Sequence, residues 1–148
     1  MHESSLARMR DVIGTHLKDR RGIATRILDV GSLDVNGTYR HLFDEPEWDY
    51  VGLDMVPGPG VDVVVRRPYR WREIRSSSFD VVVSGQAFEH IEFPWMTILE
   101  VVRVLRPGGI VVLVVPSSGP EQSAASWSWS RIALALTAGW FVARNDTS

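Results

Sequence analysis

The sequence ILDVGSLDVNG occupies residues 27–37. Its apolar start predicts a strand, which runs into Asp29-Val30-Gly31 and then into a polar turn. Because Gly31 has no side chain, a ligand can approach the backbone closely there. Ligands of open parallel sheets bind beyond the carboxyl ends of the strands, so this loop is the first candidate binding site. Turn chemistry without a ligand explains the same residues equally well.

The flanking chain alternates predicted strands with predicted helices. Strands are expected over residues 23–30, 49–54, 61–65, 79–84 and 110–115, and helices over residues 4–17, 38–43 and 91–105. The run 110–115 is apolar without alternation, which is typical of a strand buried on both faces of a parallel sheet. LRPGG at residues 105–109 is interpreted as a helix stop and a tight turn. The pattern predicts an α/β fold: a Rossmann-like, doubly wound, mostly parallel sheet with helices on both faces.

The composition is that of one ordinary globular domain. The 148 residues are 45% hydrophobic and 23% charged, which provides enough apolar material for a buried core. Sixteen Lys and Arg against eighteen Asp and Glu give a net charge of -2. With no overall positive field, we expect neither nucleic acid nor a membrane as partner, and expect a small molecule instead.

The residues and segments that the sequence lacks argue against cysteine chemistry, a metal site, secretion and a membrane span. It contains no cysteine, so it has no thiolate nucleophile, no disulfide and no cysteine-based zinc site. His2, His16 and His41 lack metal-ligand partners at useful spacing, and no metal is expected. The first residues carry no basic and then apolar leader pattern, and the longest apolar run is too short to cross a bilayer. We therefore expect a cytoplasmic protein.

A carboxylate follows the second predicted strand. Asp54 lies 23 residues after Gly31 (54 minus 31), and its two oxygens match the adjacent hydroxyls of a ribose. A dinucleotide site would need Gly-x-Gly-x-x-Gly, but Asp29 and Leu33 break that pattern, which argues against a plain NAD site. A solvated aspartate at the end of a strand is the alternative for Asp54.

The segment SGQAFEHI, residues 84–91, follows the fourth predicted strand. It contains His90, whose ordinary pKa of about 6.5 suits proton transfer, so His90 is the candidate catalytic base. A local hydrogen bond at the start of a helix is the alternative role. Glu89 would then favour the positive end of the helix dipole.

Five segments, in this order, resemble class I S-adenosylmethionine-dependent methyltransferases of the broad small-molecule type. They are ILDVGS at 27–32, YVGLDM at 50–55, FDVVVS at 79–84, FEHI at 88–91 and LRPGG at 105–109. The resemblance covers about residues 4–119, and residues 54–60 and 84–95 are also similar to one uncharacterised bacterial branch of that family. It implies S-adenosylmethionine as cofactor, and this cofactor would carry the reactive methyl group.

The resemblance assigns nine residues to the cofactor. They are Asp29, Gly31, Ser32, Leu33, Asp54, Met55, Ser84, Gly85 and Gln86. The first four would hold the methionine moiety, Asp54 the ribose hydroxyls and Met55 the adenine, while the last three would border the sulfonium and the acceptor. The protein would then mainly hold the acceptor in line with the methyl group, with His90 as base if the nucleophile carries a proton. The predicted function is methyl transfer to an unidentified small molecule.

Some features depart from the family pattern. The loop after the first strand lacks the second glycine of many members. Arg66-Arg67 follows the third predicted strand, where many members place an acidic residue near the adenine amino group, and an arginine cannot accept a hydrogen bond from that group. These departures motivate a second hypothesis, a catalytically inactive binding or assembly module of the same fold. A nucleotide-binding oxidoreductase is the third.

The last part of the chain differs from the rest. After an S-adenosylmethionine-binding part over residues 1–120, residues 121–148 form an atypical C-terminal segment of the same domain, rich in Ser, Ala and Trp. Because family-like sequence stops abruptly, we expect a truncated or frame-altered end with incomplete C-terminal strands. One helix and a short strand over residues 140–142 are expected there. Uncovered sheet edges would favour a homodimer.

Overall fold

The computed structural model describes residues 3–85, 87–114 and 140–144. The strands in these ranges form a single sheet. The strands are β1 (Thr25–Val30), β2 (Trp48–Asp54), β3 (Val63–Val64), β4 (Phe79–Gly85), β5 (Leu105–Val114) and β6 (Trp140–Arg144). Their order is β3-β2-β1-β4-β5-β6. All neighbours pair in parallel except β5 and β6, which pair antiparallel. The predicted mostly parallel α/β sheet is confirmed.

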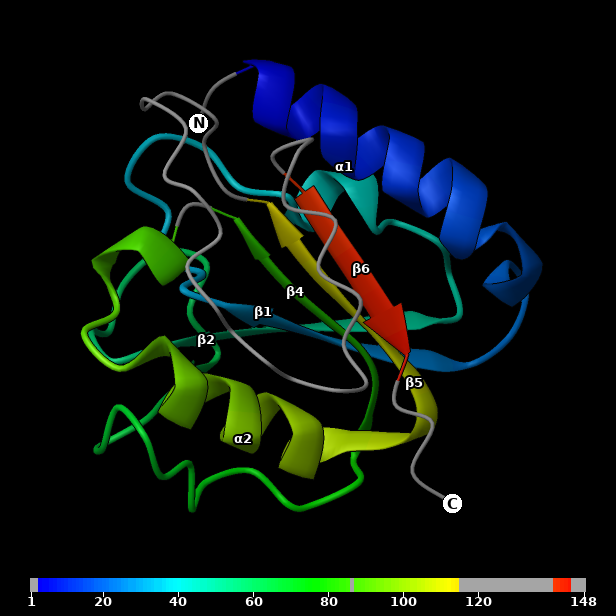
Figure 1. The fold of residues 1–148 in the computed structure, drawn as a ribbon. Helices are drawn as coiled ribbons and strands as arrows, with labels where there is room; N and C mark the ends of the chain where they lie inside the picture. The colour runs from blue at the N-terminus through cyan, green and yellow to red at the C-terminus, as the bar shows by residue number, and fades with distance from the viewer. Residues whose placement is uncertain (1–2, 86, 115–139, 145–148) are drawn as a thin grey trace, which may run out of the picture.

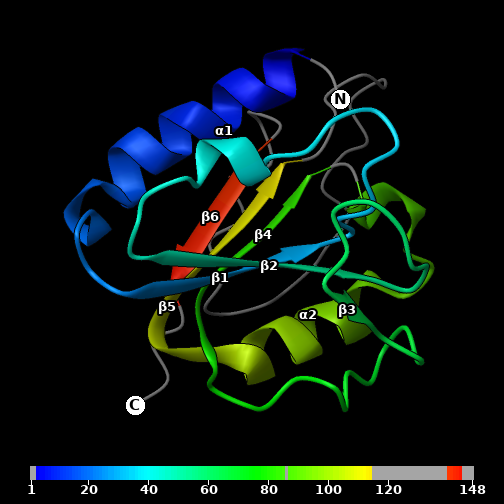
Figure 2. The same ribbon diagram turned by 180° about the vertical axis from the view of Figure 1, so that it is seen from behind.

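One α-helix covers each face of this sheet (Figure 1). α1 (Glu3–His16) lies on one face and α2 (Pro94–Val104) on the other, as the view from behind also shows (Figure 2). The remaining helical pieces are single 3-10 turns, namely η1 (Lys18–Arg20), η2 (Arg40–Leu42) and η3 (Phe88–His90). The helix expected over residues 38–43 is therefore only η2. Within the described ranges, neither α-helix has both the length and the hydrophobicity that crossing a bilayer requires.

Alternation along the strands builds two separate cores. Ile27 of β1 packs in the cluster with Met9 of α1, and the next residue, Leu28, packs in the cluster with Val101 of α2. All four side chains are at most 1% exposed. Burying each such side chain stabilises the fold by about 1.5–3 kcal/mol before conformational entropy is subtracted. Both faces of the sheet are thus buried from solvent, which explains why its central strands are almost continuously apolar.

The boundary between α2 and β5 differs in part from the prediction. α2 begins at Pro94 and not at residue 91, because proline suits the first turn of a helix, where its missing amide donor is not needed. The predicted helix stop is confirmed, since α2 ends at Val104. The prediction of a tight turn over residues 105–109 is wrong, because β5 already begins at Leu105. This residue pairs with Phe79 before an irregularity in the register.

The two edges of the sheet are closed differently. β6 confirms the strand expected near residue 140 and covers the outer edge of β5 with pairs from Ile110 and Arg144 to Val114 and Trp140. The other edge is β3, which has only two residues, and so short an edge strand offers little template for pairing. The helix expected within residues 121–139 lies outside the described residues. The truncated end and the homodimer stay predictions.

Candidate functional site

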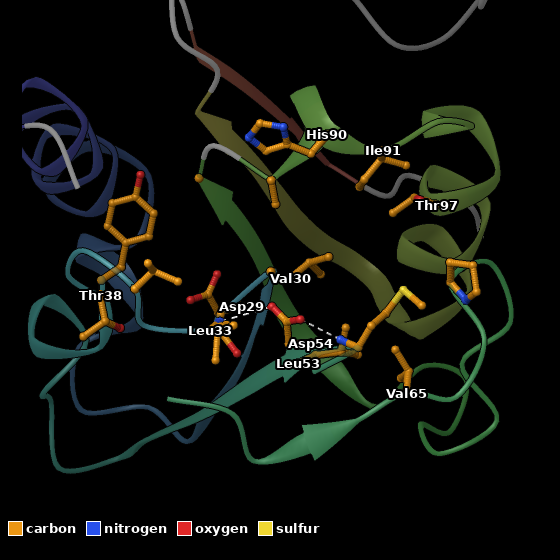
Figure 3. Close-up of a pocket in the computed structure, with 18 of the residues that line it drawn as sticks. Asp29, Val30, Leu33, Thr38, Leu53, Asp54, Val65, His90, Ile91 and Thr97 are labelled. Atoms are coloured by element: carbon orange, nitrogen blue, oxygen red, sulfur yellow. Dashed lines mark hydrogen bonds between the residues drawn. The ribbon is translucent and has the colours of Figure 1, made fainter. Parts of the chain in front are cut away.

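A cavity of about 670 Å³ lies at the carboxyl ends of β1, β2 and β4 (Figure 3). Its lining includes Asp29 from β1, Asp54 from β2 and Gly85 from β4. The sheet order places β1 between β2 and β4, so the strand order reverses beside β1. Such a switch point is where open parallel sheets bind their ligands. The volume is that of a small-molecule site.

Eight of the ten residues predicted for the site line this cavity. They are Asp29, Gly31, Ser32, Leu33, Asp54, Met55, Gly85 and His90. Ser84 is not among the lining residues: it is buried, and its hydroxyl donates a hydrogen bond to the carbonyl of Val30 at 2.7 Å, which ties β4 to β1. Gln86 lies outside the described residues. The structure therefore brings together most of a set that the chain carries in three separate segments.

Asp29 is a buried acid at the end of β1. Only 4% of the residue is exposed, and its carboxylate accepts a hydrogen bond from the Tyr50 hydroxyl at 2.5 Å. Burial raises the pKa of Asp29 to about 6, against the opposing effects of the Tyr50 hydrogen bond and the charge of Arg40. Burial and the neighbouring Asp29 also raise the pKa of Tyr50, so its hydroxyl stays a proton donor. A cationic ligand group beside Asp29 would compensate for the burial of its charge.

Asp54 joins two loops at the end of β2. One carboxylate oxygen, Oδ1, accepts hydrogen bonds from the amides of Met55 at 2.7 Å and Val56 at 3.1 Å. The other, Oδ2, accepts one from the amide of Leu33 at 3.2 Å, which binds the loop after β1 to the end of β2. A carboxylate accepts about four hydrogen bonds. About one acceptor position of Asp54 therefore remains for a ligand hydroxyl.

Glycines allow the close packing around the cavity. Gly31 has a φ of 80°, and a Cβ built on it would lie 2.3 Å from the Cβ of Ala87. A Cβ on Gly85 would lie 2.0 Å from the hydroxyl oxygen of Tyr39. No ordinary side chain fits at either position without moving its neighbours. The glycine at 31 therefore lets the loop after β1 and the segment after β4 approach each other.

The loop after β1 has Leu33 and no second glycine, and the space for the leucine side chain comes from a glycine in another loop. Leu33 packs onto Gly58. A Cβ on Gly58 would lie only 2.5 Å from a terminal methyl of Leu33, so the leucine fits there because residue 58 has no side chain. The Pro-Gly-Pro-Gly run at residues 57–60 predicts a loop, but nothing in it indicates a contact with Leu33. Ser32 turns its buried hydroxyl toward Gly52, where a Cβ would lie 2.6 Å from the oxygen. The polar hydroxyl of Ser32 thus faces β2.

The wall opposite the two aspartates is formed by the segment after β4 and by α2. Figure 3 shows His90, Ile91 and Thr97 on this side, facing Asp29 and Asp54 across the cavity. His90 is exposed, whereas Thr97 is buried. The imidazole of His90 and the two carboxylates therefore lie on opposite sides of the cavity.

The segment after β3 supplies a wall that sequence reasoning missed. Val65, Pro68 and Tyr69 line the cavity there. Arg66 and Arg67 are exposed and are not among the lining residues. The departure from the family pattern at these arginines therefore does not place positive charge in the cavity wall. Val65 ends the run Val63-Val64-Val65, which predicts only a strand, and Pro68 and Tyr69 stand between arginines, so no motif indicated this wall.

Comparison with known families decides what this arrangement belongs to. Residues 28–113 match the model of the methyltransferase domain family. This chain is a member of that family. Over 95 residues it is 34% identical to an uncharacterized methyltransferase of Mycobacterium sp. strain KMS, and the match covers 59% of this chain and 37% of that protein. The chain thus spans well under half the length of this curated relative.

Solved structures share the fold. The 1,6-didemethyltoxoflavin-N1-methyltransferase of Burkholderia thailandensis, with 1,6-didemethyltoxoflavin and S-adenosylhomocysteine bound, is 20% identical to this chain. The TM-score is 0.58, over 80% of this chain and 55% of that one. The [4+2]-cyclase SpnF is also 20% identical, with a TM-score of 0.55 over 77% of this chain and 47% of that one. A methyltransferase and a cyclase therefore have this fold in common, so the fold alone does not determine the reaction.

Proposed function

We propose that this chain binds S-adenosylmethionine in the cavity and transfers its methyl group to a small-molecule acceptor. The observation that carries the proposal is the convergence of the loop after β1, Asp54 and the segment after β4 on one cavity at the switch point of the sheet. Membership of the methyltransferase domain family supports methyl transfer as the reaction. The chemistry of the lining supports S-adenosylmethionine as the cofactor.

The donor and acceptor groups of the cavity suit this cofactor. Asp29 would face the ammonium group of the methionine moiety, since a cation there offsets the cost of the buried carboxylate. The remaining acceptor position of Asp54 would take a ribose hydroxyl. Met55 and Val65 offer apolar surface for the adenine. The ammonium group, the ribose and the adenine of the cofactor thus each have a lining group of matching chemistry.

The side chains would contribute mainly by positioning. When bound, S-adenosylmethionine supplies an electrophilic methyl group, so the protein needs to hold the acceptor in line with it. Tyr39 and Gly85 would border the place of the acceptor, where the missing side chain of Gly85 leaves room for the Tyr39 ring. His90, on the wall opposite Asp29, would take the proton of an acceptor hydroxyl or amine.

Calorimetric titration with S-adenosylhomocysteine, with NAD as the control ligand, tests the cofactor. We expect saturable one-to-one binding of the former only. Incubation with labelled methyl donor and fractionated cell extract then tests the reaction, and we expect label in an acceptor. Cofactor binding without transfer to any fraction would favour the inactive binding module, and NAD binding would favour an oxidoreductase.

A further inference from the structure

The outer surface of α2 carries large apolar side chains. Trp95, Met96, Leu99 and Val102 are 39%, 40%, 59% and 40% exposed. Phe93, just before the helix, is 36% exposed, and its ring packs edge-on against Trp95 with 5.3 Å between centroids. Residues 95, 99 and 102 follow helical spacing and share one face. We refer to these five residues as the α2 apolar face, and none of them lines the cavity.

A positively charged segment lies along this helix. Residues 66–75 contain five exposed arginines, namely Arg66, Arg67, Arg70, Arg72 and Arg75, and a single acidic residue, Glu73. None of the ion pairs found in the described part of the chain involves these five guanidinium groups. Both ribbon views show the segment running beside α2 (Figures 1 and 2). We refer to residues 66–75 as the arginine segment.

Hydrogen bonds fix the arginine segment to α2. Arg103 of the helix donates to the carbonyls of Trp71 at 2.8 Å and Ile74 at 3.0 Å. Glu100 accepts a hydrogen bond from the amide of Trp71 at 2.7 Å and also pairs with Arg103. These contacts hold the helix and the segment as one unit. The apolar side chains and the arginines therefore belong to one preformed surface.

An aromatic row joins the two parts of this surface. The ring of Tyr69, from the arginine segment, packs edge-on against Phe93 with 5.6 Å between centroids. The amide of Phe93 donates to the Tyr69 hydroxyl at 3.2 Å. Phe93 in turn contacts Trp95. Aromatic side chains with a polar edge, next to apolar and arginine side chains, are the composition found at the boundary between water and lipid.

We propose that the α2 apolar face and the arginine segment dock this protein on the surface of an anionic lipid bilayer. The side chains of Trp95 and Leu99 enter the interfacial region, and the arginines contact lipid phosphates. A second copy of the chain fits less well, because a symmetric interface brings five arginines of each copy together. This proposal differs from the expectation that no membrane is a partner. That expectation used the net charge of -2 for the whole chain, which hides the local concentration of arginines in residues 66–75. The proposal stands independently of methyl transfer.

A single labelled cysteine tests the proposal, because the chain has no cysteine of its own. The Leu99→Cys variant carries an environment-sensitive fluorophore on the α2 apolar face. The matched control is Ala7→Cys, at an exposed position of α1 on the other face of the sheet. Each full-length variant is titrated with vesicles of phosphatidylcholine alone and of phosphatidylcholine and phosphatidylglycerol in about equal parts.

We expect a blue shift of the label at residue 99 with the anionic vesicles and none at residue 7. Adding Arg67→Gln and Arg72→Gln to the Leu99→Cys variant should weaken binding about 30-fold, from about 1 kcal/mol per arginine near such a surface. No shift with either vesicle, or an equal shift with phosphatidylcholine alone, would overturn the proposal. A shift that grows with protein concentration in the absence of vesicles would overturn it in favour of a second copy. A label that is already shielded in the dilute protein would overturn it in favour of coverage by the chain itself.

Discussion

Replacing Asp29 with asparagine should stabilise the ligand-free protein at neutral pH and weaken binding of the cofactor. The carboxylate is buried at the end of β1, where it costs folding free energy when it is ionised. Asparagine has nearly the same shape, and its side-chain oxygen can still accept the hydrogen bond of Tyr50. The substitution therefore removes the charge and keeps the contact.

The magnitude follows from the two pKa values of Asp29. Folding raises the pKa from 3.8 to about 6, so the folded protein prefers the neutral acid. The stability that this group contributes is present below pH 3.8 and is lost as the pH rises through 6. The difference between the two values corresponds to about 3 kcal/mol of unfolding free energy above pH 7. Asp29→Asn should recover up to about that amount at pH 8 and much less at pH 4.

Urea unfolding of the wild type and of Asp29→Asn at pH 4 and pH 8 measures this gain. Asp11→Asn, on the exposed side of α1, is the matched control and should change stability by less than about 0.5 kcal/mol at either pH. Calorimetry at pH 8 should show weaker binding of S-adenosylhomocysteine by Asp29→Asn. If this variant is no more stable than the wild type at pH 8, the assigned cost of the buried charge is wrong.

The remaining predictions concern the loops and the wall of the cavity. Asp54→Ala should weaken S-adenosylhomocysteine binding by about 1–3 kcal/mol in calorimetry, because a ligand hydroxyl loses its acceptor; an unchanged affinity would move the ribose site elsewhere. Gly31→Val should lower the melting temperature, since its φ is 80° and a Cβ there meets Ala87. A wild-type melting temperature would refute that geometry. Arg103→Met should lower the unfolding free energy by about 1–3 kcal/mol in urea, because the Ile74 carbonyl loses its donor, the Trp71 carbonyl keeps only the Ile74 amide, and Glu100 loses its ion-pair partner. Equal stability would mean that water replaces the guanidinium.

The sheet could be predicted from the sequence because its strands are buried on both faces. Residues 110–114 are apolar at every position, which distinguishes such a strand from a half-exposed one. The start of β5 at Leu105 could not be predicted, since Pro107 and two glycines give a strong local turn signal, and only the pair of Leu105 with Phe79, ahead of the irregularity in the register, extends the strand back to this residue. Tertiary pairing decided this boundary against local preference.

The centre of the site could be predicted for a topological reason. Strand ends of a parallel sheet meet at one edge, so Asp29 and Asp54 were expected at one site, and both line the cavity. The contact of Leu33 with Gly58, and the wall formed by Val65 and Tyr69, could not be predicted. They join residues far apart in the chain through shape alone, and shape complementarity leaves no periodic signal in a sequence.

Hydrogen exchange of the backbone amides, with and without S-adenosylhomocysteine, tests the central claim most directly. If the cavity is the cofactor site, the ligand should slow exchange in peptides covering residues 29–35, 53–57 and 87–91, each of which contains lining residues. Exchange in α1 should not change, because none of its described residues lines the cavity. Binding that leaves all three peptides unchanged, or that protects a different region, would contradict the assignment of this cavity.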